Sequence, residues 1–347
     1  MKRQETNIYS IAKEAGVSIA TVSRVINQSA SVSEKSRQKV LNAIKKYDYV
    51  PNMAARNLST STSRSIGVVI PDMRNQFFMQ LLQGVTLAAD QIGYNIILFN
   101  SGDDVDREHK VLDSMRELRL RGIIITPVSY SNWETIQKLK DFESFGIPVV
   151  LLDRELIDNE FDRVVSSDEE GSFQAVTELI RLGHRKIALV SGPESVNTSY
   201  RRLCGYYRAM RTAGIPIHDE YIRKGDFTVE TAYLEAMALC RLPDPPTAIF
   251  SFNNNTTYGC LRALGDMHWK VGRDISIIGF DDIEELTWLH CDISVVSRDV
   301  GRMGRCAMER LAERVDTRSE NRESFVTSVD TELILRGSEK LENTRGF

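Results

Sequence analysis

The first fifty residues carry the hydrophobic pattern of short helices. Apolar positions recur at spacings of three and four, and no run alternates as a strand would. The pattern predicts three helices, at about 8–15, 19–27 and 34–47. Gly16 breaks the first helix, and Ser18 and Ser33 can cap the second and the third. The third helix is expected to bury Val40, Leu41 and Ile44. Two short helices around a glycine turn, braced by a third, form the helix-turn-helix layout.

From residue 65 onward, continuous apolar runs alternate with helical segments. The predicted strands fall at about 65–71, 94–100, 122–127 and 147–153, and in a second set at about 163–168, 186–192, 247–252 and 275–282. Runs that are apolar throughout are typical of parallel strands covered by helices on both faces. The sequence therefore predicts an α/β body of two doubly wound parallel-sheet lobes with a cleft between them.

Charge is distributed unevenly along the chain, whose formal net charge is -4. Residues 1–64 contain 11 Lys or Arg against 4 Asp or Glu, a charge of +7, so the remaining residues carry -11. A basic head on an acidic body indicates that the head alone binds a polyanion, although a solvated charged face would give the same count.

Composition argues against several classes of protein. Apolar residues make up 42% of the chain, and none of its apolar runs approaches the ~20 residues of a membrane span. The polar start MKRQETNIYS carries no secretory signal, so we expect a cytoplasmic protein. The cysteines are too widely spaced for a disulfide framework or a paired-cysteine zinc site, and we expect them to be reduced. The sequence lacks the phosphate-loop, HExxH, GxSxG and GxGxxG motifs, so we expect neither an enzyme nor a bound cofactor.

Several segments resemble one protein family, in order and at the expected separations. IYSIAKEAGVSIATVSRVIN (8–27) closely resembles the helix-turn-helix of the lactose-repressor (LacI/GalR) family of bacterial regulators, and PNMAARNL (51–58) is similar to that family's hinge helix. The likeness continues through SIGVVIPD, GIPVVLLDRE, LGHRKIALVSGP and ISIIGFDD. It implies a sequence-specific DNA-binding regulator, by default a repressor, whose sensor lobes are similar to periplasmic sugar-binding proteins.

The resemblance also implies a domain organisation and a set of partners. A helix-turn-helix domain (1–50) is followed by a hinge helix and linker (51–64) and by an effector-binding and dimerisation domain (65–340). Lobe 1 is expected at about 65–165 and 298–323, and lobe 2 at about 166–297 and 324–340. The expected partners are a palindromic operator duplex, a second copy of the chain and a small-molecule effector, most simply a sugar or sugar derivative.

A recognition helix reads bases in the major groove with side chains near its N-terminal end. Carried over by position, Ile19 and Ala20 match the pair that sets operator preference in the family, and Arg24 matches an arginine suited to guanine. Leu58 matches a leucine that enters the minor groove and kinks the duplex. The predicted DNA-binding residues are Ser18, Ile19, Ala20, Thr21, Ser23, Arg24, Asn27, Asn52, Ala55, Arg56 and Leu58. The alternatives are a core role for Ile19, a phosphate contact alone for Arg24, and an ordinary helix-face position for Leu58.

A cleft that binds a polyol offers carboxylates and amides to its hydroxyl groups and aromatic faces to its apolar side. The candidates stand at strand ends and in the loops that follow: Phe77, Phe78, Arg154, Asn197, Thr198, Arg202, Phe227, Asn254, Asp281 and Trp288. Asp281 is the foremost, because an acid at the exit of an apolar strand has no obvious core role. A helix cap or an inter-lobe hydrogen bond is the alternative for Asp281, and plain core packing is the alternative for Phe77 and Phe78.

Some positions depart from the usual family pattern. Gln76 stands where proline is common, Asn254 where aspartate is typical, and Arg298–Asp299 where Gln-Pro is usual. Because an amide both donates and accepts hydrogen bonds, Asn254 changes the chemistry of the cleft. A nucleoside, a purine or a sugar phosphate therefore stays open as the effector. An enzyme or a cytoplasmic solute-binding protein is a more distant alternative for the whole chain.

Overall fold

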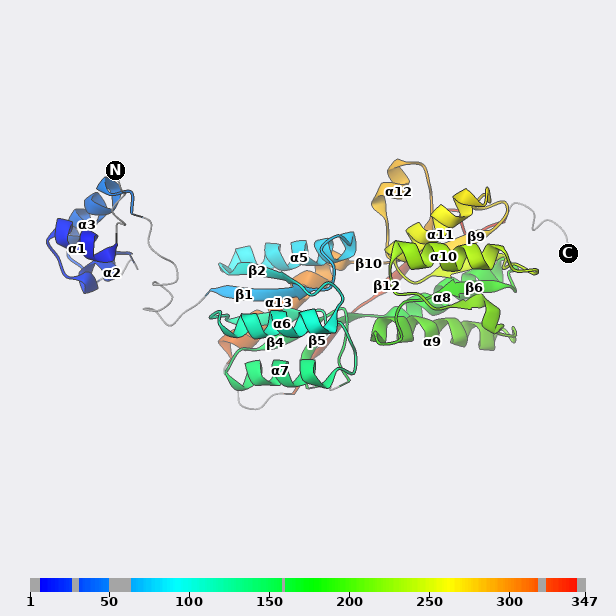
Figure 1. Cartoon of the computed structure of the whole chain (residues 1–347), viewed down its shortest axis with the longest axis horizontal. Helices are drawn as coiled ribbons and strands as arrows, with labels where there is room; N and C mark the ends of the chain where they lie inside the picture. The colour runs from blue at the N-terminus through cyan, green and yellow to red at the C-terminus, as the bar shows by residue number, and fades with distance from the viewer. Residues whose placement is uncertain (1–6, 27–30, 50–63, 158–159, 318–322, 342–347) are drawn as a thin grey trace. The chain divides into compact units, whose positions relative to one another are not determined.

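The computed structural model of the chain describes residues 7–26, 31–49, 64–157, 160–317 and 323–341. It divides the chain into two compact units, which we call the head (Met1–Ser63) and the body (Arg64–Phe347). The described helices of the head are α1 (Ile8–Ala15), α2 (Ile19–Ile26) and α3 (Glu34–Lys46) (Figure 1). Asn27 and the predicted hinge residues Asn52, Ala55, Arg56 and Leu58 lie outside the described residues.

The head helices pack around one small apolar core. Ile11 of α1, Val22 and Val25 of α2 and Val40 of α3 are buried in it. α1 ends at Gly16, whose φ of 63° lies in the left-handed region that glycine adopts without strain. The three helices begin and end close to the predicted residues.

Side-chain caps define the starts of the second and third head helices. The Thr21 N–H donates to Ser18 Oγ at 3.2 Å, and the Ser36 N–H donates to Ser33 Oγ at 3.4 Å. One inward position of α3 was predicted wrongly, because Leu41 is 46% exposed. Positions three apart share a helix face, so α3 buries Ala43 together with Val40 instead.

The body is built on two six-stranded sheets. The first has the strand order β11-β5-β4-β3-β1-β2 and the second the order β12-β10-β9-β8-β6-β7. The strands of the first sheet are β1 (Ser65–Ile70), β2 (Asn95–Asn100), β3 (Gly122–Ile125), β4 (Val149–Leu152), β5 (Asp162–Ser166) and β11 (Val326–Val329). Those of the second are β6 (Ile187–Val190), β7 (Ile222–Arg223), β8 (Ala248–Ser251), β9 (Ser276–Phe280), β10 (Ser294–Arg298) and β12 (Thr331–Ile334). Neighbouring strands are parallel except β10 and β12, which are antiparallel.

Helices cover both faces of each sheet, as continuous apolar strands require. In lobe 1, α5 (Gln76–Ile92) and α13 (Val300–Asp316) pack on one face, and α6 (Val105–Arg116) and α7 (Trp133–Ser144) pack on the other. In lobe 2 the two pairs are α8 (Asp168–Arg181) with α9 (Asn197–Thr212) and α10 (Val229–Cys240) with α11 (Asn254–Asp266). A 3-10 turn, η1 (Asp219–Tyr221), and the short α12 (Glu284–Trp288) complete lobe 2.

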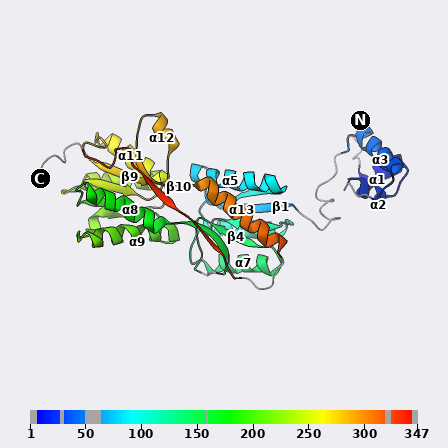
Figure 2. The same cartoon turned by 180° about the vertical axis from the view of Figure 1, so that it is seen from behind.

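Within the described residues the chain passes between the lobes three times, after β5, after β10 and between β11 and β12 (Figure 2). Two predictions are corrected here. The strand expected at 163–168 does not open the second lobe, because β5 pairs with β4 and β11 in the first sheet. The last crossing falls after residue 329 rather than at 323, because β11 completes the edge of the first sheet before β12 joins β10.

Two further observations concern membrane spans and disulfides. Among the helices that the structure describes, none is long and apolar enough to cross a membrane. The cysteines Cys204, Cys240, Cys260, Cys291 and Cys306 are all free.

Candidate functional site

Helix α2 exposes one edge that carries the predicted base-reading side chains. While Val22 and Val25 face the core, Ile19 is 40% exposed and does not pack into it. Ser18, Ala20 and Arg24 are exposed as well, and Thr21 and Ser23 are half-buried. The edge therefore combines an apolar side chain, hydroxyl groups and one guanidinium group, the chemistry that reads base edges.

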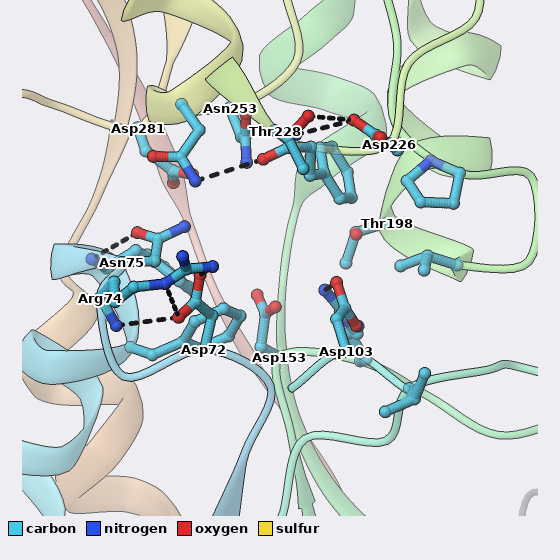
Figure 3. A pocket seen from close by; sticks show the side chains of 18 of the residues that line it. Asp72, Arg74, Asn75, Asp103, Asp153, Thr198, Asp226, Thr228, Asn253 and Asp281 are labelled. Atoms are coloured by element: carbon cyan, nitrogen blue, oxygen red, sulfur yellow. Dashed lines mark hydrogen bonds and ion pairs between the residues drawn. The ribbon is translucent and has the colours of Figure 1, made fainter. Parts of the chain in front are cut away.

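A cavity of about 580 Å³ lies between the two lobes of the body. Its walls are the loops that follow the carboxyl ends of the strands, from β1, β2, β3 and β4 in lobe 1 and from β6, β7, β8 and β9 in lobe 2. Figure 3 shows side chains from both lobes pointing into this space. Ligands of doubly wound sheets bind at this end of the strands, so we call this cavity the effector cleft.

The backbone is strained where it borders the effector cleft. Four residues have φ in the left-handed region that residues other than glycine rarely adopt. They are Asp103 (54°), Asp153 (69°), Phe227 (65°) and Asp281 (68°). All four residues line the cleft. Strain of this kind persists only where the surrounding structure imposes it, and it gathers at binding sites.

Arg298 lies between acidic side chains from both lobes. Its Nε donates to Asp281 Oδ1 at 2.9 Å, and its Nη1 donates to Asp153 Oδ1 and to Ser166 Oγ, both at 2.7 Å. Within the described part of the chain, the second oxygen of each of these two carboxylates receives no hydrogen bond. These two oxygens are therefore open acceptors beside the effector cleft.

The protonation of this cluster follows from its burial and charges. Burial raises the pKa of Asp153, and the charge of Arg298 offsets part of that rise. Burial by itself would lower the pKa of Arg298, but the charges of Asp281, Asp153 and Asp168 raise it overall. Arg298 is therefore a buried, permanently charged group.

Two other arginines of the cleft have most of their donors taken by the protein. Arg154 binds both carboxylate oxygens of Asp103, at 2.6 and 3.3 Å. Arg202 is 2% exposed, and it donates to Asp168 at 2.7 Å and to the carbonyl oxygen of Phe252. Its guanidinium carbon lies 3.6 Å from the centre of the Phe280 ring. Both arginines act first as supports that hold the walls of the cleft.

The structure places most of the predicted effector residues at this one cavity. Phe77, Phe78, Arg154, Thr198, Arg202, Phe227 and Asp281 line the effector cleft. Asn254 lines a neighbouring cavity of about 200 Å³, where its Nδ2 donates to Asn75 Oδ1 across the lobes at 2.8 Å.

Two predicted effector residues lie elsewhere. Asn197 uses its side chain to bind Glu155, accepting from its N–H at 2.9 Å and donating to its carboxylate at 3.1 Å. Trp288 ends α12 with 66% of its surface exposed, and it lines neither cavity.

Sequence reasoning missed several polar groups of the cleft. Asp72, Asp103, Asp153, Asp226 and Arg298 all line it. The signal for Asp153 was available, because it follows an apolar strand directly, as Asp281 does. The sequence showed Arg298 only as a departure from the family pattern. Its partners Asp153 and Ser166 lie more than a hundred residues earlier in the chain, and Asp281 lies at the end of the neighbouring strand.

A helix-turn-helix unit and a two-lobed body with a ligand cleft together define a ligand-responsive DNA-binding regulator. Two family models match the chain: "Bacterial regulatory proteins, lacI family" over residues 7–52, and "Periplasmic binding proteins and sugar binding domain of LacI family" over residues 63–331. The chain belongs to the LacI family.

Curated relatives and solved structures agree with this membership. The HTH-type transcriptional repressor PurR of Vibrio vulnificus (strain CMCP6) is 32% identical over 97% of this chain and 99% of its own length. Catabolite control protein A of Priestia megaterium is 34% identical over 96% of this chain and 99% of its own length. The crystal structure of the lac repressor dimer bound to operator and the anti-inducer ONPF has a TM-score of 0.84 at 25% identity and covers 97% of this chain and 100% of its own.

The chain is thus a DNA-binding transcriptional regulator and not an enzyme. Repressors of this family bind operator DNA as dimers and respond to small molecules.

Proposed function

We propose that the chain represses transcription from the cytoplasm as a homodimer on a near-palindromic operator, and that a small neutral polyhydroxy compound in the effector cleft controls its affinity for DNA. The observation that carries the proposal is the pairing of an exposed reading edge on α2 with a polar inter-lobe cleft. The lac repressor relative is itself a dimer bound to operator, which supports the dimeric state.

DNA reading is assigned to the exposed edge of α2. We infer that Arg24 donates to a guanine edge and that Ile19 and Ala20 pack against neighbouring bases, with Ser18, Thr21 and Ser23 close to phosphate oxygens. Asn27 and the hinge residues Asn52, Ala55, Arg56 and Leu58 extend the same interface by family position, with Leu58 as the wedge in the minor groove.

The test of this interface begins with selection of an operator from random duplexes by the full chain. Arg24→Ala is then expected to weaken binding to that operator by about 1–3 kcal/mol and to relax its base preference, because a bidentate guanine contact is lost. Gel-shift titration against the operator and a scrambled duplex measures both effects.

Lys13→Ala is the matched control, since Lys13 is an exposed, positively charged residue on α1. It is expected to leave the ratio of operator to scrambled affinity unchanged, because a phosphate contact carries no sequence information. Equal losses on both duplexes for Arg24→Ala would reduce Arg24 to a phosphate contact.

The effector class follows from the charges and rings of the cleft. Six carboxylates and four guanidinium groups line it, from Asp72, Asp103, Asp153, Asp226, Glu230 and Asp281 and from Arg74, Arg154, Arg202 and Arg298. This excess of acid disfavours an anion, while the open oxygens of Asp153 and Asp281 suit hydroxyl donors. Phe77, Phe78 and Phe227 offer apolar faces to a sugar ring.

A thermal-shift screen of the full chain tests this assignment with neutral sugars, sugar acids, sugar phosphates, nucleosides and purines as probes. A neutral sugar is expected to raise the melting temperature of the body, and the phosphorylated form of the same sugar is expected to bind more weakly. A purine as the only stabilising probe would overturn the sugar assignment and leave the DNA-binding assignment intact.

A further inference from the structure

Arg298 lies where the chain crosses from one lobe to the other, and the proposed function assigns no role to this position. It is the last residue of β10 in lobe 2, directly before the crossing to α13 in lobe 1. Its side chain is only 2% exposed, although it carries a full positive charge. A buried guanidinium group is costly unless it is paired, so its partners define what it does.

The partners of Arg298 in lobe 1 come from three elements. Asp153 follows β4 and accepts at 2.7 Å, and Ser166 ends β5 and accepts at 2.7 Å. The ring of Phe77, from α5, lies 4.3 Å from the guanidinium carbon. Lobe 1 thus holds the guanidinium group by a charge, a hydroxyl group and an aromatic face.

Arg298 also contacts two acids and an aromatic ring of lobe 2. Asp281, at the end of β9, accepts from Nε at 2.9 Å, and Asp168, at the start of α8, lies 3.9 Å from Nη1. The ring of Phe280 lies 5.5 Å from the guanidinium carbon. One cation therefore bridges Asp153 of one sheet and Asp281 of the other.

Separation of the two lobes is opposed by this arrangement. Movement of the strand end that carries Asp281 away from the one that carries Asp153 must break at least one of the two ion pairs. A buried carboxylate would then lose its counter-charge, which destabilises the separated state. The cleft-facing hydrogen bond from Asn254 to Asn75, at 2.8 Å, acts in the same direction without charge.

We propose that Arg298 is a built-in cross-link between the lobes, which holds them in one arrangement in the absence of any effector. It occupies the place between two acids that a small-molecule donor would otherwise have to bridge. An effector therefore adds its contacts to a body that is already held together. The cross-link itself concerns the effector-free protein and holds whatever the effector is.

The test measures the distance between the lobes in the effector-free full chain. Spin labels are placed on cysteines introduced at Lys110 of α6 and Leu234 of α10, both exposed, after Cys204, Cys291 and Cys306 are replaced by serine. Mixing with excess unlabelled chain isolates the distance within one chain. The chain with native Arg298 is expected to give one narrow distance distribution, and Arg298→Gln is expected to broaden it and shift it to longer distances.

Two further variants keep the test decisive. Asp281→Asn preserves side-chain shape but removes one charge, so it is expected to broaden the distribution in the same direction even if Arg298→Gln folds poorly. Arg314→Gln breaks an ion pair to the buried Asp162 that lies wholly within lobe 1, at 2.6 Å, and is expected to keep the narrow distribution. If Arg298→Gln and Asp281→Asn fold, by circular dichroism, and keep the narrow distribution, the cross-link is refuted.

Discussion

His184 makes the stability of lobe 2 depend on pH. The residue is 3% exposed, with Nδ1 2.9 Å from the Thr247 hydroxyl and Nε2 3.3 Å from the Glu339 carbonyl oxygen. Burial lowers the pKa of His184 below its ordinary 6.5, and the Glu339 carbonyl only partly opposes this. The unfolded chain therefore takes up a proton more readily than the folded one. The stabilisation is complete above about pH 6.5 and is lost as the pH falls toward the folded-state pKa.

Urea unfolding at pH 7.5, 6.5 and 5.5 checks this prediction. We expect the free energy of unfolding to fall as the pH is lowered through this range, because the unfolded chain binds the proton that the buried imidazole takes up less readily. His184→Gln is expected to flatten the dependence and to lower stability at pH 7.5, because Thr247 and Glu339 lose their imidazole partner. His218→Gln, at an exposed histidine, should keep the original slope. An unchanged slope in His184→Gln would contradict the assignment.

At the residue scale, the sequence predicted which residues line the cleft better than it predicted the hydrogen bonds between them. The rule that ligand groups follow parallel strands found Asp281 and Arg154, and applied evenly it would also have found Asp153. It could not show that Asp281 shares Arg298 with Asp153, because that depends on how two sheets meet. The bond that Asp281 makes to Arg298 lies within lobe 2, and it is Arg298 that donates across to Asp153 of lobe 1.

At the element scale, lobe 1 depends on a close crossing of α5 and α13. A Cβ atom added to Gly304 would lie 2.2 Å from the Leu81 carbonyl oxygen, and one added to Gly84 would lie 2.2 Å from that of Gly301. Backbone cannot yield as a flexible side chain can. Gly304→Ala is therefore expected to separate the helices and to lower the free energy of unfolding by about 1–3 kcal/mol, despite the better helix propensity of alanine.

Gly265 of α11 supplies the matched substitution. A Cβ atom there meets nothing within 4 Å, so Gly265→Ala is expected to be neutral or to stabilise by up to about 1 kcal/mol. Chemical denaturation of both variants measures the contrast. Equal stability of the two would show that the α5–α13 crossing relaxes without cost.

Local periodicity predicted the strands of the described residues between 64 and 282 closely but could not predict the C-terminal strands. β11 and β12 are four residues each and are separated only by Asp330, yet they belong to different sheets. Nothing in TSVDTELI distinguishes one long strand from two that divide at a crossing. Partner strands far earlier in the chain decide it, which is why the last lobe boundary was placed too early.

At the scale of the whole molecule, the head is basic and the body is acidic. DNA binding by the head and effector binding by the body should therefore depend differently on salt concentration. Each phosphate that the basic head neutralises releases counterions, so the operator affinity is expected to fall with a slope of about -0.9 per phosphate in a plot of log K against log salt. The effector cleft has Arg154, Arg202 and Arg298 already paired with carboxylates, and a neutral ligand displaces no ions from it. Calorimetric binding of the stabilising sugar from the screen should therefore change little over the salt range in which DNA binding is lost. A steep rise of the sugar affinity with salt would instead show that the ligand breaks one of these ion pairs, because the freed charges take up salt ions.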